Sequence, residues 1–236
     1  KQMVKDGVKT VAYVGFSDAW GDSAYAALEK YAGPAGLQIV ANERYARSDN
    51  SVTGQILKVM TKRPDAVLGA GAGTPGALPF IELADRKYGG RLYGTHAILS
   101  PEFVKLVGAA GEGIVVPTGP VLVGDQLPDA HPSRKIIGEY NQAYEKANGA
   151  KPYDVFSSYA FDAWMLVAKA AEQIPADVTP GTPAFRDALH DQINKLTKVE
   201  ATQGTFSFTP ESAYGTGLES VIMVRLEKGS WSLLKD

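Results

Sequence analysis

Short apolar runs alternate with amphipathic stretches along the first half of the chain. The apolar runs have the length and composition of buried strands and lie at residues 10–16, 37–41, 65–70, 91–94 and 113–116. The intervening stretches carry apolar residues at helical spacing and lie at 24–32, between 49–51 and Pro64, at 77–84 and from Ser100 onward. In the first of these helices we expect Leu28 and Tyr31 to face inward, and in the last we expect Ser100 to cap the N-terminus. This alternation predicts an α/β fold built on a doubly wound, mainly parallel sheet.

The pattern changes after residues 117–120. Helical spacing dominates the next part of the chain, at 133–147, 153–174 and 183–196, and no strand separates these three helices. Strands return at 204–208, 221–226 and 231–234, and the last two form a hairpin around 228–230. Because the three helices have apolar faces but no sheet of their own to cover, we expect a second, incomplete unit.

Composition narrows the function more than the fold. The 236 residues suit one large domain or two small ones, and 44% of them are hydrophobic and 21% charged. A net charge of -2 with scattered basic residues gives no field for nucleic acid, so we expect no nucleic-acid partner. The absence of cysteine excludes disulfides, thiolate nucleophiles and cysteine metal sites. Residues 1–7 lack an apolar signal core, so a secretory signal peptide is absent or already removed.

The stretch 65–76 contains a literal G-x-G-x-x-G at Gly71, Gly73 and Gly76, between a predicted strand and a predicted helix. This context is typical of a dinucleotide fingerprint, which would imply a Rossmann-like, nicotinamide-dependent oxidoreductase. Two features oppose that interpretation. The acidic residue expected at the end of the next strand is missing, and Pro75 removes a backbone donor where a pyrophosphate needs one. The alternative is a tight turn that packs closely or lets backbone approach a ligand.

Other catalytic patterns are missing from the sequence. It has no G-x-S-x-G elbow, no P-loop lysine, no convincing pair of carboxylates and no histidine spacing typical of zinc sites. We therefore expect a protein that is not an enzyme and that has no catalytic residues, no cofactor and no metal.

Three residues stand out as candidates for ligand contact. His96 lies just past a strand end, at the same sheet edge as the turn formed by residues 71–76, called here the glycine turn. His131 and His190 lie in polar surroundings typical of the surface. Trp20 falls in the predicted loop 17–23 after the first strand, where a large ring is costly unless it covers something. Phe156 lies near the start of the long helix. The alternatives are a structural role for His96 and core packing for Phe156.

Several short patterns occur in an order that covers nearly the whole chain. They are Thr-Val-Ala-Tyr-Val at 10–14 with Ala-Trp-Gly at 19–21, Pro-Asp-Ala-Val at 64–67, Leu-Tyr-Gly at 92–94, Gly-Glu-Gly-Ile at 111–114 and Gly-x-Phe-x-Phe at 204–208. Together they resemble the type I periplasmic solute-binding proteins of ABC importers, specifically the leucine/isoleucine/valine-binding branch. The resemblance implies a two-lobed protein that traps a small solute by hinge closure and delivers it to ABC permease membrane subunits. It also implies a periplasmic location, or lipid anchoring outside a Gram-positive cell.

The resemblance further implies how the chain is divided. Residues 1–117 and 217–236 correspond to the complete C-terminal lobe, and 121–210 to an incomplete other lobe that lacks the N-terminal half of its sequence. Hinge crossings are expected near 117–121 and 209–216. We therefore expect this chain to bind solute poorly, or to form a homodimer through the surface that the missing segment leaves uncovered.

Site residues are carried over by position. In relatives an aromatic residue closes over the ligand at Trp20, and another lines the pocket at Phe156. Ala72 to Thr74, with Gly73 between them, replace an aromatic turn and would leave more room. His96 stands where amino-acid binders use a glutamate to hold the α-ammonium group.

The change at His96 suggests the solute. A buried ammonium without a carboxylate partner is costly, so we expect an organic acid that lacks an amine, such as an aromatic or branched keto acid. A branched-chain or aromatic amino acid, an amide and a urea are the alternatives. The same fold also serves as the ligand-sensing module of receptors, which is a further alternative to transport.

Overall fold

The computed structural model describes residues 1–152, 154–210 and 212–235. Tyr153, where the long helix was predicted to begin, lies outside the described residues, as do Glu211 in the predicted crossing 209–216 and Asp236. The chain divides into two compact units. Unit 1 comprises Lys1–Pro117 and Met223–Ser232, and unit 2 comprises Thr118–Ile222 and Leu233–Asp236.

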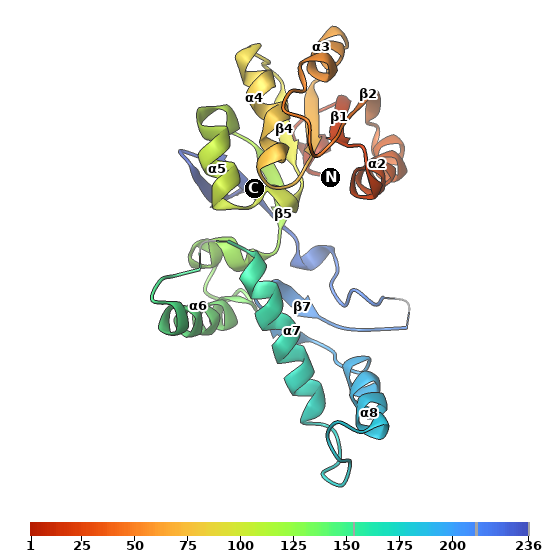
Figure 1. Ribbon diagram of the computed structural model, residues 1–236, viewed down its shortest axis with the longest axis vertical. Helices are drawn as coiled ribbons and strands as arrows, with labels where there is room; N and C mark the ends of the chain where they lie inside the picture. The colour runs from red at the N-terminus through yellow and green to blue at the C-terminus, as the bar shows by residue number, and fades with distance from the viewer. Residues whose placement is uncertain (153, 211, 236) are drawn as a thin grey trace. The chain divides into compact units, whose positions relative to one another are not determined.

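A seven-stranded sheet of order β2-β1-β3-β4-β5-β8-β9 forms the centre of unit 1 (Figure 1). Its strands are β1 (Thr10–Phe16), β2 (Gln38–Tyr45), β3 (Ala66–Ala70), β4 (Arg91–Gly94), β5 (Val115–Thr118), β8 (Ile222–Glu227) and β9 (Ser230–Leu233). The pairs β1–β2, β1–β3, β3–β4 and β4–β5 are parallel. The predicted α/β fold with a mainly parallel, doubly wound sheet is therefore confirmed.

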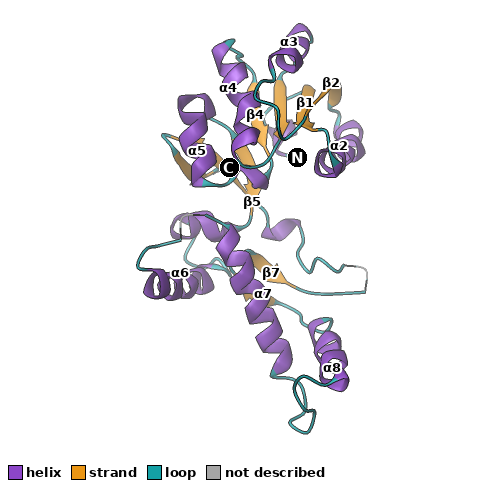
Figure 2. Cartoon of the chain, viewed as in Figure 1, coloured by secondary structure: helices purple, strands orange, loops and turns teal. Residues whose placement is uncertain are grey.

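Helices connect these strands, as Figure 2 shows. They are α1 (Gln2–Lys5), α2 (Ala19–Ala32), α3 (Thr53–Thr61), α4 (Leu78–Asp85) and α5 (Pro101–Val107), with short 3₁₀ turns η1 (Gly33–Ala35), η2 (Thr74–Ala77), η3 (His96–Ile98) and η4 (Gly108–Gly111). The predicted serine cap is present, because the Ser100 hydroxyl accepts a hydrogen bond from the Phe103 amide at 3.3 Å.

Two expectations about α2 are wrong. The helix begins at Ala19 rather than Ala24, because the Asp18 carboxylate accepts a hydrogen bond from the Gly21 amide at 3.1 Å and caps the first turn. Tyr31 was expected to face inward but is 64% exposed. The helix buries only Gly21 and Ala32, one near each end, so most of its length lies at the surface.

The core of unit 1 lies around β1 and β3. Its fully buried members include Val14, Phe16, Ile56, Val67 and Leu83, which come from the strands and from the inward faces of α3 and α4. The rings of Phe16 and Tyr45 meet edge to face, with centroids 5.1 Å apart. This core holds the ends of β1 and β3 in fixed positions.

Unit 2 contains the three predicted helices and a small sheet, of which the strand at 204–208 was predicted and its partner strand was not. The elements are η5 (Pro120–Gln126), α6 (Arg134–Asn148), α7 (Phe156–Ala171), α8 (Pro183–Ile193), β6 (Val199–Ala201), β7 (Gly204–Phe206) and η6 (Leu218–Ser220). Strands β6 and β7 pair antiparallel. Met165 and Leu166 of α7 pack against Val199 and Ala201 of β6, so the helices are not without a sheet of their own.

One face of α7 remains largely open. Phe156, Tyr159, Trp164 and Val167 are exposed, and Trp164 is the most exposed of them at 68%. On its other side, α7 buries Ser158, Asp162 and Met165. Unit 2 therefore covers only part of the apolar surface of α7 and leaves the rest exposed to solvent.

Candidate functional site

The candidate site of unit 1 lies at the carboxyl ends of its central parallel strands. In the order β2-β1-β3-β4, the chain leaves β1 toward β2 on one side and later returns to β3 on the other. Open α/β sheets bind ligands at such a switch point, because diverging connections leave a crevice there. The segments that follow β1, β3 and β4 therefore form the wall where a ligand is expected.

Trp20 and His96 meet at this edge. Trp20 lies in the first turn of α2, where the Asp18 cap fixes the backbone. Its half-buried ring packs against the core cluster of β1 and β3. His96 begins η3 directly after β4, and the two rings lie edge to face with centroids 5.8 Å apart and planes at 75°. The structure thus brings together two residues that the sequence placed only on the same edge.

The glycine turn adjoins this ring pair. Ala72 packs against the same core cluster as Trp20. The Gly73 amide donates a hydrogen bond to the Ala97 carbonyl oxygen at 3.2 Å, which ties the turn to η3. Gly73 has a φ of +55°, a conformation that favours glycine, and Thr74 is exposed. Ala72, Gly73 and Thr74 therefore lie beside the segment that carries His96.

Close packing explains the glycine spacing. A side chain at Gly71 would place its Cβ 2.6 Å from the Cα of Gly76 and 2.4 Å from the Tyr45 hydroxyl. That hydroxyl donates a hydrogen bond to the Pro75 carbonyl oxygen at 3.2 Å. The turn is thus packed on itself and on Tyr45, in agreement with the tight-turn interpretation of the motif.

The site has one titratable ring and two unpaired polar atoms. Partial desolvation lowers the pKa of His96 below its usual value of 6.5, although the residue retains exposed surface, so the ring is neutral at pH 7. Trp20 Nε1 and Thr95 Oγ1 are buried and have no hydrogen-bond partner among the described residues. Buried polar atoms are normally paired, so a water molecule or a ligand is expected at each.

Sequence reasoning missed two residues near this edge, Thr95 and Arg47. Thr95 precedes His96, and Arg47 follows β2 by two residues. The Arg47 guanidinium pairs with Asp18 at 2.6 Å and lies 4.3 Å over the Phe16 ring, so it supports the α2 cap. With the Gly21 amide, this pair lowers the pKa of Asp18. The sequence did contain a signal for Thr95 and Arg47, because each follows the end of a predicted strand, as His96 does.

Phe156 lies on a different unit. It occupies the first position of α7, is 43% exposed, and its ring lies 6.3 Å from that of Tyr159. The structure does not bury it in a core, and its role as a ligand contact stays a prediction.

Two further observations concern the described residues as a whole. They contain no group of three or more histidine and acidic side chains placed to hold a metal ion. Every helix formed by them is too short or too polar to cross a lipid bilayer.

Comparison with known proteins addresses the resemblance directly. A family model described as periplasmic binding protein matches residues 1–230. The chain is similar to the solved structure of Rp1789 from Rhodopseudomonas palustris strain CGA009, with 35% identity and a TM-score of 0.93 over 99% of this chain and 66% of that one. An extracellular ligand-binding receptor from Rhodopseudomonas palustris HaA2 is 36% identical, with a TM-score of 0.90 over the same shares.

A putative branched-chain amino acid ABC transporter from Rhodospirillum rubrum is also similar, with 25% identity and a TM-score of 0.80 over 99% of this chain and 62% of that one. A comparison with curated protein sequences found no match. The chain spans just under two thirds of the length of the solved structures that it resembles. The family match extends through both units, and the chain belongs to the periplasmic binding protein family.

Proposed function

We propose that this chain belongs to the solute-binding component of an ABC importer and that it captures a small organic acid. The protein would act outside the cytoplasmic membrane and deliver its solute to the permease subunits. Family membership supports the class of function. The solute, the permease and the location are part of the proposal.

The observation that carries the proposal is the Trp20–His96 pair at the switch point of the sheet. An indole face and a neutral imidazole suit a planar, partly apolar solute. The unpaired Trp20 Nε1 and Thr95 Oγ1 offer hydrogen bonds to a carboxylate or carbonyl oxygen. None of these groups offers the negative charge that an ammonium group needs, which favours an acid without an amine.

The glycine turn bears on the size of the solute. Ala72 and Gly73 present almost no side chain, so the turn leaves space for an aromatic or branched group. The same fold holds benzoate in a solute-binding protein from Rhodopseudomonas palustris, which is 23% identical with a TM-score of 0.76. At that identity the likeness concerns the fold alone, and the preference for an acid rests on His96 and its neighbours.

Calorimetric titration tests this function. Phenylpyruvate, the keto acid of leucine, leucine itself and an aliphatic amide would each be titrated into the protein extended to the length of its relatives. We expect saturable binding of a keto acid and weaker or no binding of leucine. The variant His96→Glu should lose affinity for the acid, whereas His190→Glu, at an exposed position on α8, should not. Tight leucine binding without acid binding would overturn the proposal.

The two other functions are less well supported. An oxidoreductase would need a pyrophosphate cradle at the glycine turn, but Gly71 and Gly76 pack against each other there. A ligand-sensing receptor module would use the same wall as a transport protein. Solute import by a reconstituted permease, with and without this protein, separates transport from sensing.

A further inference from the structure

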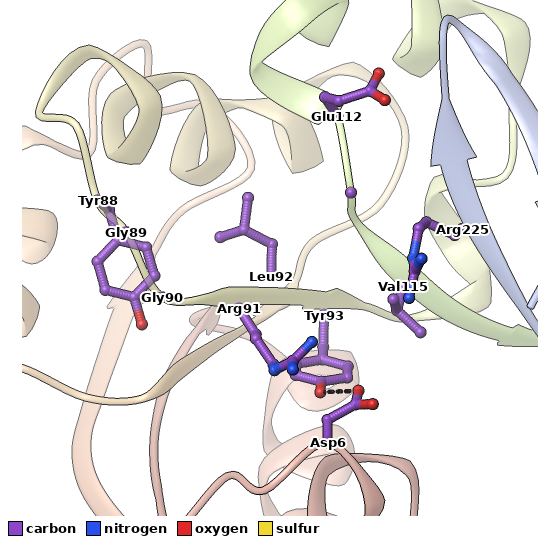
Figure 3. A pocket seen from close by; sticks show the side chains of 11 residues that line it. Asp6, Tyr88, Gly89, Gly90, Arg91, Leu92, Tyr93, Glu112, Val115 and Arg225 are labelled. Carbon is purple, nitrogen blue, oxygen red and sulfur yellow. Dashed lines mark hydrogen bonds between the residues drawn. The ribbon is translucent and has the colours of Figure 1, made fainter.

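A cavity lies at the opposite end of the sheet of unit 1 from the candidate solute site, by the amino ends of β4 and β5 (Figure 3). It has a volume of about 410 Å³, within the range of small-molecule sites. Its polar lining comes from Asp6, Tyr88, Arg91, Tyr93, Glu112 and Arg225. Ligands of open α/β sheets bind at the carboxyl ends of the strands, so this cavity is separate from the candidate solute site.

The carboxylates of this cavity already accept hydrogen bonds from the protein. Asp6 Oδ1 accepts from Gln2 Nε2 at 2.9 Å, and Asp6 Oδ2 accepts from the Tyr93 hydroxyl at 2.5 Å. Glu112 Oε2 accepts from the Lys228 amide at 2.9 Å. Burial, reinforced by the hydrogen bond to Asp6, raises the pKa of Tyr93, so its hydroxyl stays protonated and donates.

The guanidinium groups are less engaged. No ion pair or hydrogen bond joins the Arg91 side chain to the residues that the structure describes. Arg225 pairs with Glu227 at 3.7 Å, which is too long for a hydrogen bond. In Figure 3, Arg91 and Tyr93 point to the same side of β4, and Arg225 extends from β8 beside Val115. Each guanidinium carries five N–H donors, so the two arginines bring to the cavity donors that an oxyanion can use.

We propose that this cavity binds a small oxyanion, a phosphate or carboxylate group, between Arg91 and Arg225. Guanidinium groups bind both kinds of oxyanion through paired N–H donors. Glu112 is exposed, and its negative charge repels an anion and so lowers the affinity of the cavity for it. We therefore expect that neutralising a basic residue of the cavity lowers anion affinity and that neutralising Glu112 raises it. Non-specific attraction to a charged surface would not depend on these particular residues.

Titration of the chain with inorganic phosphate and with citrate, in a buffer of low ionic strength, tests this site. We expect saturable binding of at least one of them, and the preferred one identifies the chemical group. Arg91→Gln and Arg225→Gln should each weaken binding at least tenfold. Glu112→Gln keeps an acceptor for the Lys228 amide and should tighten binding severalfold.

Arg186→Gln on α8 of unit 2 is the matched control and should bind the anion as the unmodified chain does. Thermal unfolding checks that each variant is folded, which is expected for Arg91→Gln because Arg91 is exposed. Absence of saturable binding to both anions would overturn the inference. So would an equal loss of affinity in Arg186→Gln, because that result indicates general charge attraction. Binding of the keto acid at the Trp20–His96 site should be unchanged in the Arg91 variant, so the two sites are tested separately.

Discussion

The rings of Trp20 and His96 meet edge to face, with centroids 5.8 Å apart. Trp20 follows β1 and His96 follows β4, and β3 lies between these strands in the sheet. The pair therefore spans the carboxyl end of β3, where the glycine turn begins. The contact thus joins the connections that follow β1 and β4 at the place where the solute is proposed to bind.

Removal of the indole should affect both stability and binding. Trp20→Ala deletes a half-buried ring from the core edge and should lower the free energy of unfolding by about 1–3 kcal/mol. In the protein of full family length it should also weaken solute binding at least tenfold. Tyr31→Ala, at an exposed position of the same helix, should change stability by less than about 0.5 kcal/mol. Chemical denaturation and calorimetry measure the two effects, and equal effects of both variants would contradict the assignment.

The lowered pKa of His96 makes stability depend on pH. In the unfolded chain the imidazole titrates near its ordinary value of about 6.5, whereas in the folded protein it binds its proton only at lower pH. The unfolded state therefore gains its proton first, and stability is lost as pH falls from 6.5 toward the folded pKa. His131 is shifted in the same direction by burial and adds to this trend.

Denaturation of His96→Asn between about pH 5 and 8 checks this assignment. The variant should show a smaller loss of stability on acidification than the unmodified chain. A nuclear magnetic resonance titration in which His96 gains its proton at or above pH 6.5 would contradict it.

Asp162 should be a major stabiliser of unit 2. It is 2% exposed, and its carboxylate accepts hydrogen bonds from the Thr202 amide and hydroxyl and from the Gln203 amide, at 2.8–2.9 Å. Asp162→Ala leaves these buried donors unpaired and should cost about 1–3 kcal/mol or more. The exposed Asp187→Ala is the control and should be nearly neutral. Hydrogen exchange of the Thr202 and Gln203 amides reports the effect locally, and unchanged protection would argue against it.

Two glycines provide a matched test of the packed turn. Gly71→Ala places a methyl group against the Gly76 backbone and the Tyr45 hydroxyl, so it should destabilise unit 1 by about 1–3 kcal/mol. Gly54→Ala lies on α3 with no atom near the added methyl group, and it should stabilise the protein by up to about 1 kcal/mol. Thermal unfolding distinguishes these signs. If both variants unfold at the same temperature, the turn is less tightly packed than the structure indicates.

The open face of α7 should promote association. Phe156, Tyr159, Trp164 and Val167 are exposed on this helix, and large apolar patches seek partners. We predict that the 236-residue chain self-associates through this face and that Trp164→Ser reduces the association. Tyr214→Ser, which removes an exposed aromatic ring outside this helix, should not reduce the association. Size-exclusion chromatography with light scattering measures the effect, and a stable monomer of the unmodified chain would contradict it.

Strand positions were predictable because their signal is local. The apolar runs of β1 and β4 coincide with the predicted ranges 10–16 and 91–94. The local structure around Trp20 was not predicted, because residues 17–23 were expected to form a loop and α2 begins at Ala19. In the structure Gly21 is helical, and its missing side chain lets the Phe16 carbonyl approach, since a Cβ there would lie 1.8 Å from that oxygen.

Other features depended on contacts distant in sequence. Strand β6 has three residues and no periodic signal, and Asp162, about 40 residues earlier, holds the turn that follows it. The contact between Trp20 and His96 likewise depends on strand order, which no local pattern encodes. The sequence could therefore place both residues at one edge of the sheet, but only the structure shows that their rings touch.

A crystal structure of the protein at the full length of its relatives, grown with the keto acid that binds best, tests the central claim most directly. The account predicts electron density for the acid against the rings of Trp20 and His96, with hydrogen bonds from Trp20 Nε1 or Thr95 Oγ1. Density for a bound solute that touches neither ring would contradict it.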